Sequence, residues 1–287
     1  MKLTIITGFL GAGKTTILNQ IIAQHPDKKF GLIINEFGAE DIDGQIVEKS
    51  DAEDIVELAN GCICCVVRQD LQQAALKLAD QGNVDYILIE TSGLAEPLPV
   101  AQTFAVDNLQ GKISLDSIVC IVDTENYKVG MENFEVGVKQ LEAADIVVLN
   151  KLKTANPDSA QLVRQLINNV NPGAAVIENL DDKLSTDLLI DTEKWDLEKL
   201  SKVEQEEHEH EHHHVDEVVF VTDKPIQNIK LQNWVRNEFP SGAVRAKGIL
   251  RVEIFPGQFG LFLFQMVGAN RVLIPFIPTR SDFDSSK

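Results

Sequence analysis

Residues 8–15 have the types and spacing of a phosphate-binding loop. They match G-x-x-x-x-G-K-[ST], directly follow an apolar run and precede a segment with helical periodicity. In such a loop the glycines let backbone N–H groups converge on phosphates, and the following helix adds partial positive charge. Lys14 would then reach the β- and γ-phosphates of a nucleoside triphosphate, and the hydroxyl of Thr15 would bind Mg²⁺. The other loop positions predicted to contact the nucleotide are Gly8, Gly11, Ala12, Gly13 and Thr16.

A carboxylate and a glycine follow the strand-like run at residues 84–89. Glu90 can contact Mg²⁺ or its bound waters, and Gly93 can turn its backbone N–H toward the γ-phosphate. The spacing E-x-x-G is weak evidence by itself, because a glutamate at a strand end more often caps a helix or faces solvent. Ligands of parallel sheets bind at the carboxyl ends of the strands, however, and this placement favours the functional interpretation. We therefore assign Lys14, Thr15, Glu90 and Gly93 to triphosphate hydrolysis.

Asn150 and Lys151 follow another strand-like run and begin an N-K-x-D pattern of the kind found in GTPases. The aspartate of that pattern accepts hydrogen bonds from guanine that adenine does not offer. Lys153 stands in its place here and has no acceptor. Losing a charge-assisted hydrogen bond of this kind costs about 1.5 to 3 kcal/mol. We expect Asn150 and Lys151 to bind GTP, with ATP as the alternative, and Asp158 is the nearest later carboxylate that can substitute.

Three cysteines within four residues form a second group of reactive side chains. Zn²⁺ and similar ions bind thiolate and imidazole, but three adjacent cysteines cannot all coordinate one ion without strain. We therefore expect two or three of them to bind metal together with a carboxylate from residues 35–44. Two alternatives stay open, namely buried hydrophobic cysteines and a C-x-x-C redox pair. The predicted thiol ligands are Cys62, Cys64 and Cys65. The candidate carboxylate ligands from outside this cysteine cluster are Glu36, Glu40 and Asp43.

A tract rich in histidine and acidic residues lies between residues 204 and 217. It contains seven Asp or Glu and five His, with neither Lys nor Arg. Several imidazoles on one segment raise the local concentration of metal ligands without imposing a fixed geometry. We expect this tract to gather divalent metal, and the alternatives are a purification tag or an acidic linker with incidental histidines. Its predicted ligands are His208, His210, His212, His213 and His214.

The elements that must position these side chains alternate between strand-like and helical patterns through the first 180 residues. The strand-like runs are mostly continuous in apolar residues, as in parallel strands buried on both faces. The helical runs repeat apolar residues at three-to-four-residue spacing. This alternation predicts an α/β fold, a P-loop NTPase with a mostly parallel sheet flanked by helices. The predicted strands are residues 3–7, 30–35, 84–90, 118–123, 146–150 and 175–178.

The pattern changes after residue 180, which predicts a second domain. We expect residues 1–180 to form the nucleotide-binding domain with the C-x-C-C metal motif, and residues 181–217 to form a charged linker with the histidine tract. Residues 218–287 are predicted to form a small α+β domain with turns at glycine-containing segments. Its predicted strands are residues 218–222, 244–254, 261–267 and 272–276, and its predicted helix is 231–239.

The composition excludes several classes of partner. The 287 residues carry a net charge of −18, so the protein repels nucleic acid phosphates and anionic membranes. No apolar run has the roughly 20 residues needed to span a bilayer, and the N-terminus lacks the features of a signal peptide. We therefore expect a cytoplasmic protein with no nucleic acid or membrane partner, whose clustered thiols lie in a reducing compartment.

Taken together, these segments resemble the CobW-type metallochaperone GTPases, a branch of the P-loop GTPases that serve metalloenzyme maturation. Residues 8–16, 35–38, 61–65 and 90–97 carry the resemblance, and G-C-I-C-C is highly specific. The histidine tract resembles the variable tract that precedes the C-terminal domain in this family, and residues 245–248 resemble part of that domain. Two features depart from the family pattern, since Lys153 breaks the base-specificity motif and the C-terminal portion is shorter than expected.

The resemblance implies a GTPase that binds Zn²⁺ or a related divalent ion at the C-x-C-C motif and delivers it to a client metalloprotein. Residues 36–44 and the segment from Gly93 onward occupy switch-like positions, which γ-phosphate and Mg²⁺ would order and hydrolysis would release. If the thiol site has a different geometry in the two states, nucleotide and metal affinities must be linked reciprocally. One alternative is a cobalt or nickel accessory GTPase for metalloenzyme or cobalamin assembly, because imidazoles suit Zn²⁺, Co²⁺ and Ni²⁺. Another is a zinc buffer or sensor that does not hydrolyse nucleotide. The oligomeric state is left open, with a homodimer as one option.

Overall fold

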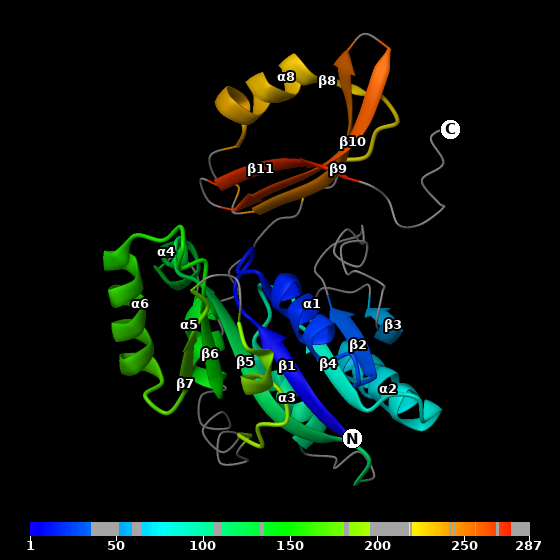
Figure 1. Ribbon diagram of the computed structural model, residues 1–287, viewed down its shortest axis with the longest axis vertical. Helices are drawn as coiled ribbons and strands as arrows, with labels where there is room; N and C mark the ends of the chain where they lie inside the picture. Colours follow the sequence, from blue (N-terminus) through cyan, green and yellow to red (C-terminus); the bar gives the residue numbers. More distant parts are fainter. Residues whose placement is uncertain are drawn as a thin grey trace. The chain divides into compact units, whose positions relative to one another are not determined.

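The chain forms two compact units, which Figure 1 shows. The first comprises Met1–Ala39 and Val47–Asp216, and the second comprises Glu40–Ile46 and Glu217–Lys287. The computed structural model describes residues 1–35, 52–58, 65–105, 111–132, 135–180, 184–195, 218, 220–240, 243, 245–255, 257–267 and 270–276.

A seven-stranded sheet forms the centre of the first unit, in the order β3-β2-β4-β1-β5-β6-β7. Its strands pair in parallel throughout, which confirms the predicted α/β fold. The sequence did not predict β3, because this edge strand carries Glu53, Asp54 and Glu57 in place of a continuous apolar run. The strands are β1 (Lys2–Thr7), β2 (Phe30–Asn35), β3 (Ala52–Leu58), β4 (Tyr86–Glu90), β5 (Ser114–Asp123), β6 (Ile146–Asn150) and β7 (Ala175–Glu178).

Helices cover both faces of this sheet (Figure 1). In β2, Leu32 packs in one core cluster with Ile17 of α1, whereas its neighbour Ile33 packs in another with Leu71 of α2. Successive side chains of a strand point to opposite faces, so the two clusters lie on opposite sides of the sheet. No helix among the described residues is long and apolar enough to cross a bilayer. The helices are α1 (Lys14–Gln24), α2 (Cys65–Gln81), α3 (Pro97–Ala105), α4 (Tyr127–Glu132), α5 (Glu135–Ala143) and α6 (Pro157–Val170).

Part of the segment expected to be a linker, residues 184–195, packs on the first unit. Leu184, Leu189 and Ile190 are buried in the same core cluster as α1. The short helix η2 (Thr186–Leu188) lies at the end of α1, where the hydroxyl of Thr186 lies 3.1 Å from Nε2 of His25. This stretch therefore contributes to the core of the nucleotide-binding unit.

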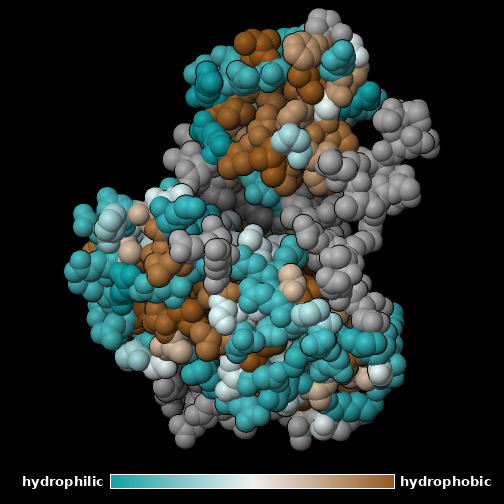
Figure 2. Space-filling model, in the orientation of Figure 1, coloured by the Kyte–Doolittle hydropathy of each residue, from teal (hydrophilic) through white to brown (hydrophobic). Residues whose placement is uncertain are grey.

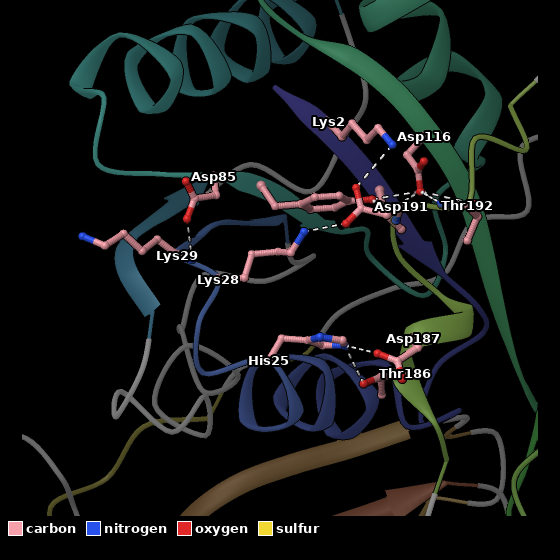
Figure 3. Close-up of polar contacts among 12 residues, drawn as sticks. Lys2, His25, Lys28, Lys29, Asp85, Asp116, Thr186, Asp187, Asp191 and Thr192 are labelled. Atoms are coloured by element: carbon pink, nitrogen blue, oxygen red, sulfur yellow. Dashed lines mark hydrogen bonds and ion pairs between the residues drawn. The ribbon is translucent and has the colours of Figure 1, made fainter.

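A buried carboxylate, Asp116 of β5, fastens the end of this segment to the sheet (Figure 3). It accepts hydrogen bonds from the Tyr86 hydroxyl at 2.9 Å and from the backbone N–H groups of Thr192 and Glu193 at 3.0 and 2.7 Å. Glu193 has a positive φ of 52°, which non-glycine residues rarely adopt. The carboxylate of Asp116 therefore stabilises a backbone turn that is unfavourable by itself.

Asp191 adds ion pairs to this attachment, with Lys28 at 2.5 Å and Lys2 at 3.3 Å (Figure 3). The hydrogen bond from Lys28 lowers the pKa of Asp191 below its usual value. A lowered carboxyl pKa stabilises the fold above the unfolded pKa and loses that effect as the pH falls through the folded one. The ion pairs therefore persist at neutral pH and weaken only in acid.

The second unit is a four-stranded sheet in the order β11-β10-β9-β8, with the helix α8 (Asn228–Asn233) and the π-helical turn η3 (Trp234–Glu238). The predicted helix and three of the predicted strands are confirmed. The strand predicted at 218–222 is wrong for its described residues, because Val218 and Phe220 lie outside any strand with exposed side chains. Hydrophobic surface gathers over part of this unit in Figure 2. The strands are β8 (Ile226–Gln227), β9 (Arg245–Phe255), β10 (Gln258–Val267) and β11 (Asn270–Pro275).

Candidate functional site

The phosphate loop connects β1 to α1 at the carboxyl end of the sheet. Its backbone requires glycine at two points, since Gly8 has a φ of 138° and Gly13 a φ of 99°. A Cβ at Gly8 would lie 2.2 Å from the carbonyl oxygen of Ile121, and a Cβ at Gly13 would lie 2.4 Å from Nδ2 of Asn150. The loop therefore lies directly against the ends of β5 and β6, where no larger residue fits.

Lys14 is the first residue of α1 and is only 6% exposed. Its Nζ donates hydrogen bonds to the carbonyl oxygens of Gly8 at 3.0 Å and Phe9 at 3.4 Å. The ammonium group is thus held by the loop itself, at the positive end of the helix dipole. A buried positive charge at a helix N-terminus favours an anionic ligand, such as the phosphates of a nucleotide.

Thr15 and Glu90, which were assigned from separate motifs, meet beside this loop. The hydroxyl of Thr15 donates to Oε1 of Glu90 at 2.8 Å, and Glu90 is the last residue of β4, the neighbour of β1. Hydroxyl and carboxylate oxygens are hard ligands of the type that Mg²⁺ prefers. The pair is therefore chemically suited to Mg²⁺. The side chain of Thr16, another predicted nucleotide contact, is exposed.

Gly93 also lies against the phosphate loop. A Cβ at this position would lie 2.6 Å from the backbone nitrogen of Leu10. The preceding Thr91 hydroxyl donates to the hydroxyl of Thr7, the last residue of β1, at 3.0 Å. The segment after β4 is thus fastened to the end of β1, and its position suits a backbone N–H that contacts a γ-phosphate.

Asn150 and Lys151 hold the phosphate loop from β6. Nδ2 of Asn150 donates to the carbonyl oxygen of Ala12 at 2.9 Å, and Nζ of Lys151 donates to that of Gly11 at 2.7 Å. Lys151 also pairs with Asp123 at 2.7 Å. The sequence did not single out Asp123, although its place at the carboxyl end of β5 is a signal that could have identified it. These contacts shape the loop.

The residues near Asn150 and Lys151 that could contact a nucleotide base differ in burial. Lys153 and Asp158 are both exposed, and Asp158 lies in the first turn of α6. Asn179, which follows β7, is 3% exposed and donates from Nδ2 to Oδ1 of Asn150 at 2.9 Å. Sequence reasoning missed Asn179 as well, because nothing local distinguishes it from other polar residues after a strand.

The predicted metal ligands lie almost entirely outside the described residues. Cys65 is the first residue of α2, but the structure does not describe its side chain. Within the described ranges, no group of three His, Cys, Asp or Glu residues could hold a metal ion. Burial raises the pKa of the Cys120 thiol to about 12, so this cysteine stays protonated and is a poor ligand. The ligands outside the described ranges are Glu36, Glu40, Cys62, Cys64, His208, His210, His212, His213 and His214, with Asp43 as the further candidate.

Two family models match the chain. Residues 2–178 match the CobW/HypB/UreG nucleotide-binding domain, and residues 215–280 match the cobalamin synthesis protein cobW C-terminal domain. The chain is 31% identical to the zinc chaperone YjiA of Escherichia coli, over 93% of this chain and 86% of that protein. It is 26% identical to the zinc-regulated GTPase metalloprotein activator 1 of Dictyostelium discoideum, over 91% of this chain and 65% of that protein.

The chain is shorter than several of these relatives. It spans between 47% and 65% of the length of three curated proteins that it matches. Among solved structures, the Zn(II)-bound YjiA GTPase from E. coli matches 98% of this chain and 91% of its own, with a TM-score of 0.52 and 24% identity. This likeness supports the shared fold.

Proposed function

Because this chain belongs to the CobW/HypB/UreG family of nucleotide-binding proteins, we propose that it is a GTP-hydrolysing metallochaperone. It binds Zn²⁺ and transfers the ion to a client metalloprotein in the cytoplasm. The observation that carries the proposal is a phosphate loop with Lys14 buried in it and the Thr15–Glu90 pair beside it. The relatives named zinc chaperone and zinc-regulated GTPase metalloprotein activator support the proposed metal transfer.

In the nucleotide half, the loop binds the triphosphate and Lys14 stabilises negative charge that develops on the β- and γ-phosphates. Thr15 and Glu90 would hold Mg²⁺ directly or through its waters, and the bound ion would supply charge neutralisation for the phosphates. Gly93 contacts the γ-phosphate through its backbone N–H. Loss of that phosphate on hydrolysis releases the segment after β4.

In the metal half, Cys62, Cys64 and Cys65 form the high-affinity site together with Glu36 or Glu40. The histidine tract at residues 208–214 gathers metal for it. We retain a nucleotide-binding domain at 1–180 and a C-terminal domain at 218–287. Of the linker expected at 181–217, residues 184–195 pack on the first unit, so we assign this part to the nucleotide-binding unit.

The test is steady-state hydrolysis of GTP and of ATP by the full chain, with and without stoichiometric Zn²⁺, Co²⁺ or Ni²⁺. We expect GTP hydrolysis whose rate changes most with Zn²⁺, because thiolate ligands suit this ion best and the switch-like segments connect the thiol cluster to the nucleotide. Absence of hydrolysis with either nucleotide and every metal would overturn the enzymatic half and favour a zinc buffer. A larger change in the hydrolysis rate with Co²⁺ or Ni²⁺ would identify that ion, in place of Zn²⁺, as the metal that the protein carries.

The same assay extends to Cys64→Ala, which should weaken tight Zn²⁺ binding by about 10- to 100-fold because a thiolate ligand is lost. Affinity for GDP should stay within about twofold, since the phosphate loop is a separate set of contacts. Competition with a chromophoric zinc chelator measures the first quantity and a fluorescent nucleotide the second. Cys120→Ala is the matched control, because that buried thiol is a core side chain. Unchanged zinc affinity in Cys64→Ala would remove the thiol cluster from the site.

Base selectivity provides a further prediction, at Lys153. Lys153→Asp restores an acceptor for the guanine N1–H and amine, so the preference for GTP over ATP should rise by about 10- to 100-fold. The ratio of kcat/KM for the two nucleotides measures it. Lys153→Ala removes the same positive charge without adding an acceptor and serves as the control. Equal selectivity in both variants would show that position 153 does not face the base.

A further inference from the structure

The helix α4 packs closely on the phosphate loop, and α5 packs closely on α4. A Cβ at Gly130 in α4 would lie 2.7 Å from Cγ of Phe9 in the loop. A Cβ at Gly137 in α5 would lie 2.3 Å from the carbonyl oxygen of Gly130. Neither contact leaves room for a side chain, so α4 packs directly on the loop and α5 packs directly on α4. Close-packed elements of this kind transmit small displacements to their neighbours.

α5 also contacts the segment that follows β4, through Gln140. This side chain is fully buried, and its Nε2 donates to the carbonyl oxygens of Gly93 and Ala95, each at 3.1 Å. The preceding residue, Lys139, pairs with Glu96 at 3.1 Å. Residues 93–96 are therefore held between α5 on one side and Leu10 of the phosphate loop, which Gly93 touches, on the other.

The oxygen of the Gln140 side-chain amide, unlike its nitrogen, makes no hydrogen bond with the described residues. Oε1 is buried and accepts no hydrogen bond from any residue that the structure describes. A buried acceptor without a donor is unfavourable, and such groups in folded proteins need an explanation. In the adjoining turn, the N–H of Leu94 makes a long 3.4 Å contact with the hydroxyl of Ser92. The amide of Gln140 therefore holds this turn through its Nε2 alone.

We infer that Gln140 is a positioning residue for recognition of the γ-phosphate, an inference that rests on the proposed nucleotide hydrolysis. By holding the carbonyl groups of Gly93 and Ala95, it presents the backbone of Gly93 to the third phosphate. GDP lacks that phosphate and does not require this arrangement. Loss of the amide therefore weakens triphosphate binding selectively, whereas an amide that only supports the fold would affect both nucleotides alike.

The experiment uses Gln140→Met, which keeps the volume of the side chain and removes both N–H donors. In the full chain, the Kd for a non-hydrolysable GTP analogue should rise about tenfold, while the Kd for GDP stays within about twofold. The kcat for GTP should fall by a similar factor. The readout is the ratio of the two dissociation constants, which general destabilisation does not change.

Asn171→Ala is the matched control, because Asn171 follows α6 and contacts α5, the helix to which Gln140 belongs. Nδ2 of Asn171 donates to the carbonyl oxygens of Leu141 and Ala144 near the end of α5, each at 2.8 Å. Its loss should lower the melting temperature and leave the ratio of nucleotide affinities unchanged. A change of the ratio in Asn171→Ala equal to that in Gln140→Met would reduce Gln140 to a structural role.

Two further outcomes decide the inference. Equal weakening of both nucleotides in Gln140→Met, or of neither, would overturn it, whereas failure of the wild-type chain to bind any nucleotide would overturn the proposed function instead. Hydrogen exchange on the wild-type chain covers the case in which Gln140→Met does not fold. The GTP analogue, but not GDP, should slow exchange of the amides at residues 93–96, and identical exchange with both would contradict the inference.

Discussion

Replacing Lys14 with alanine is expected to abolish measurable nucleotide hydrolysis and to weaken GTP binding by roughly 100- to 10,000-fold. The ammonium group is nearly fully buried within the loop and would form two charge-assisted contacts with phosphate oxygens, at about 1.5 to 3 kcal/mol each. Phosphate release under steady-state conditions measures the turnover, and titration of a fluorescent GTP analogue measures the affinity. The fold should persist, because Asn150 and Lys151 also hold the loop through the carbonyl oxygens of Ala12 and Gly11.

Lys153→Ala is the control for this first prediction, because it removes one positive charge from an exposed position near the same end of the sheet. It should leave triphosphate affinity within about threefold of the wild-type value, since an exposed charge is screened by solvent. Hydrolysis by Lys14→Ala at the wild-type rate would show that turnover occurs at another site. Equal losses in both variants would mean that general charge attraction, and not the loop, controls binding.

Replacing Asp116 with alanine should produce the largest loss of stability in the chain, about 3 to 5 kcal/mol in the free energy of unfolding of the first unit. The carboxylate is 2% exposed and accepts hydrogen bonds from Tyr86, Thr192 and Glu193 (Figure 3). Its removal takes the acceptor from the backbone N–H groups of Thr192 and Glu193 and frees a turn with positive φ. At about 2 to 4 °C per kcal/mol, the melting temperature should fall by about 6 to 20 °C.

Thermal and urea unfolding of Asp116→Ala measure this loss, with Asp187→Ala as the control. The carboxylate of Asp187 is largely exposed and lies 3.6 Å from His25, so its removal should cost less than about 1 kcal/mol. If Asp116→Ala has the same melting temperature as the wild-type protein, residues 191–193 are held by other contacts. Below its melting temperature the variant should still bind GDP, because the phosphate loop lies at the opposite, carboxyl end of the strands.

The strands of the first unit were predictable because parallel strands covered on both faces must be apolar throughout, and runs such as residues 146–150 contain little else. The same rule missed β3, whose place at the edge of the sheet tolerates Asp54 and Glu57. It also misplaced a strand at 218–222, since an apolar run forms a strand only where a neighbour pairs with it. Val218 and Phe220 have exposed side chains instead.

The position and backbone shape of the phosphate loop could be predicted from the sequence alone, because the loop consists of consecutive residues with glycines at fixed spacing. The glycines, Lys14 and Thr15 are neighbours in the chain and stay neighbours in the fold. The sequence likewise identified Glu90, since the carboxyl ends of parallel strands meet at one edge of the sheet.

Only the tertiary structure decided which distant residues hold this loop and the other segments of the first unit. Asp123 pairs with Lys151, Gln140 holds Gly93, and Asp116 fastens a segment more than 70 residues away. No periodicity or spacing marks these side chains, because each acquires its partner only when helices and strands pack. A buried polar group is recognisable by what surrounds it, and those surroundings come from segments far apart in the chain.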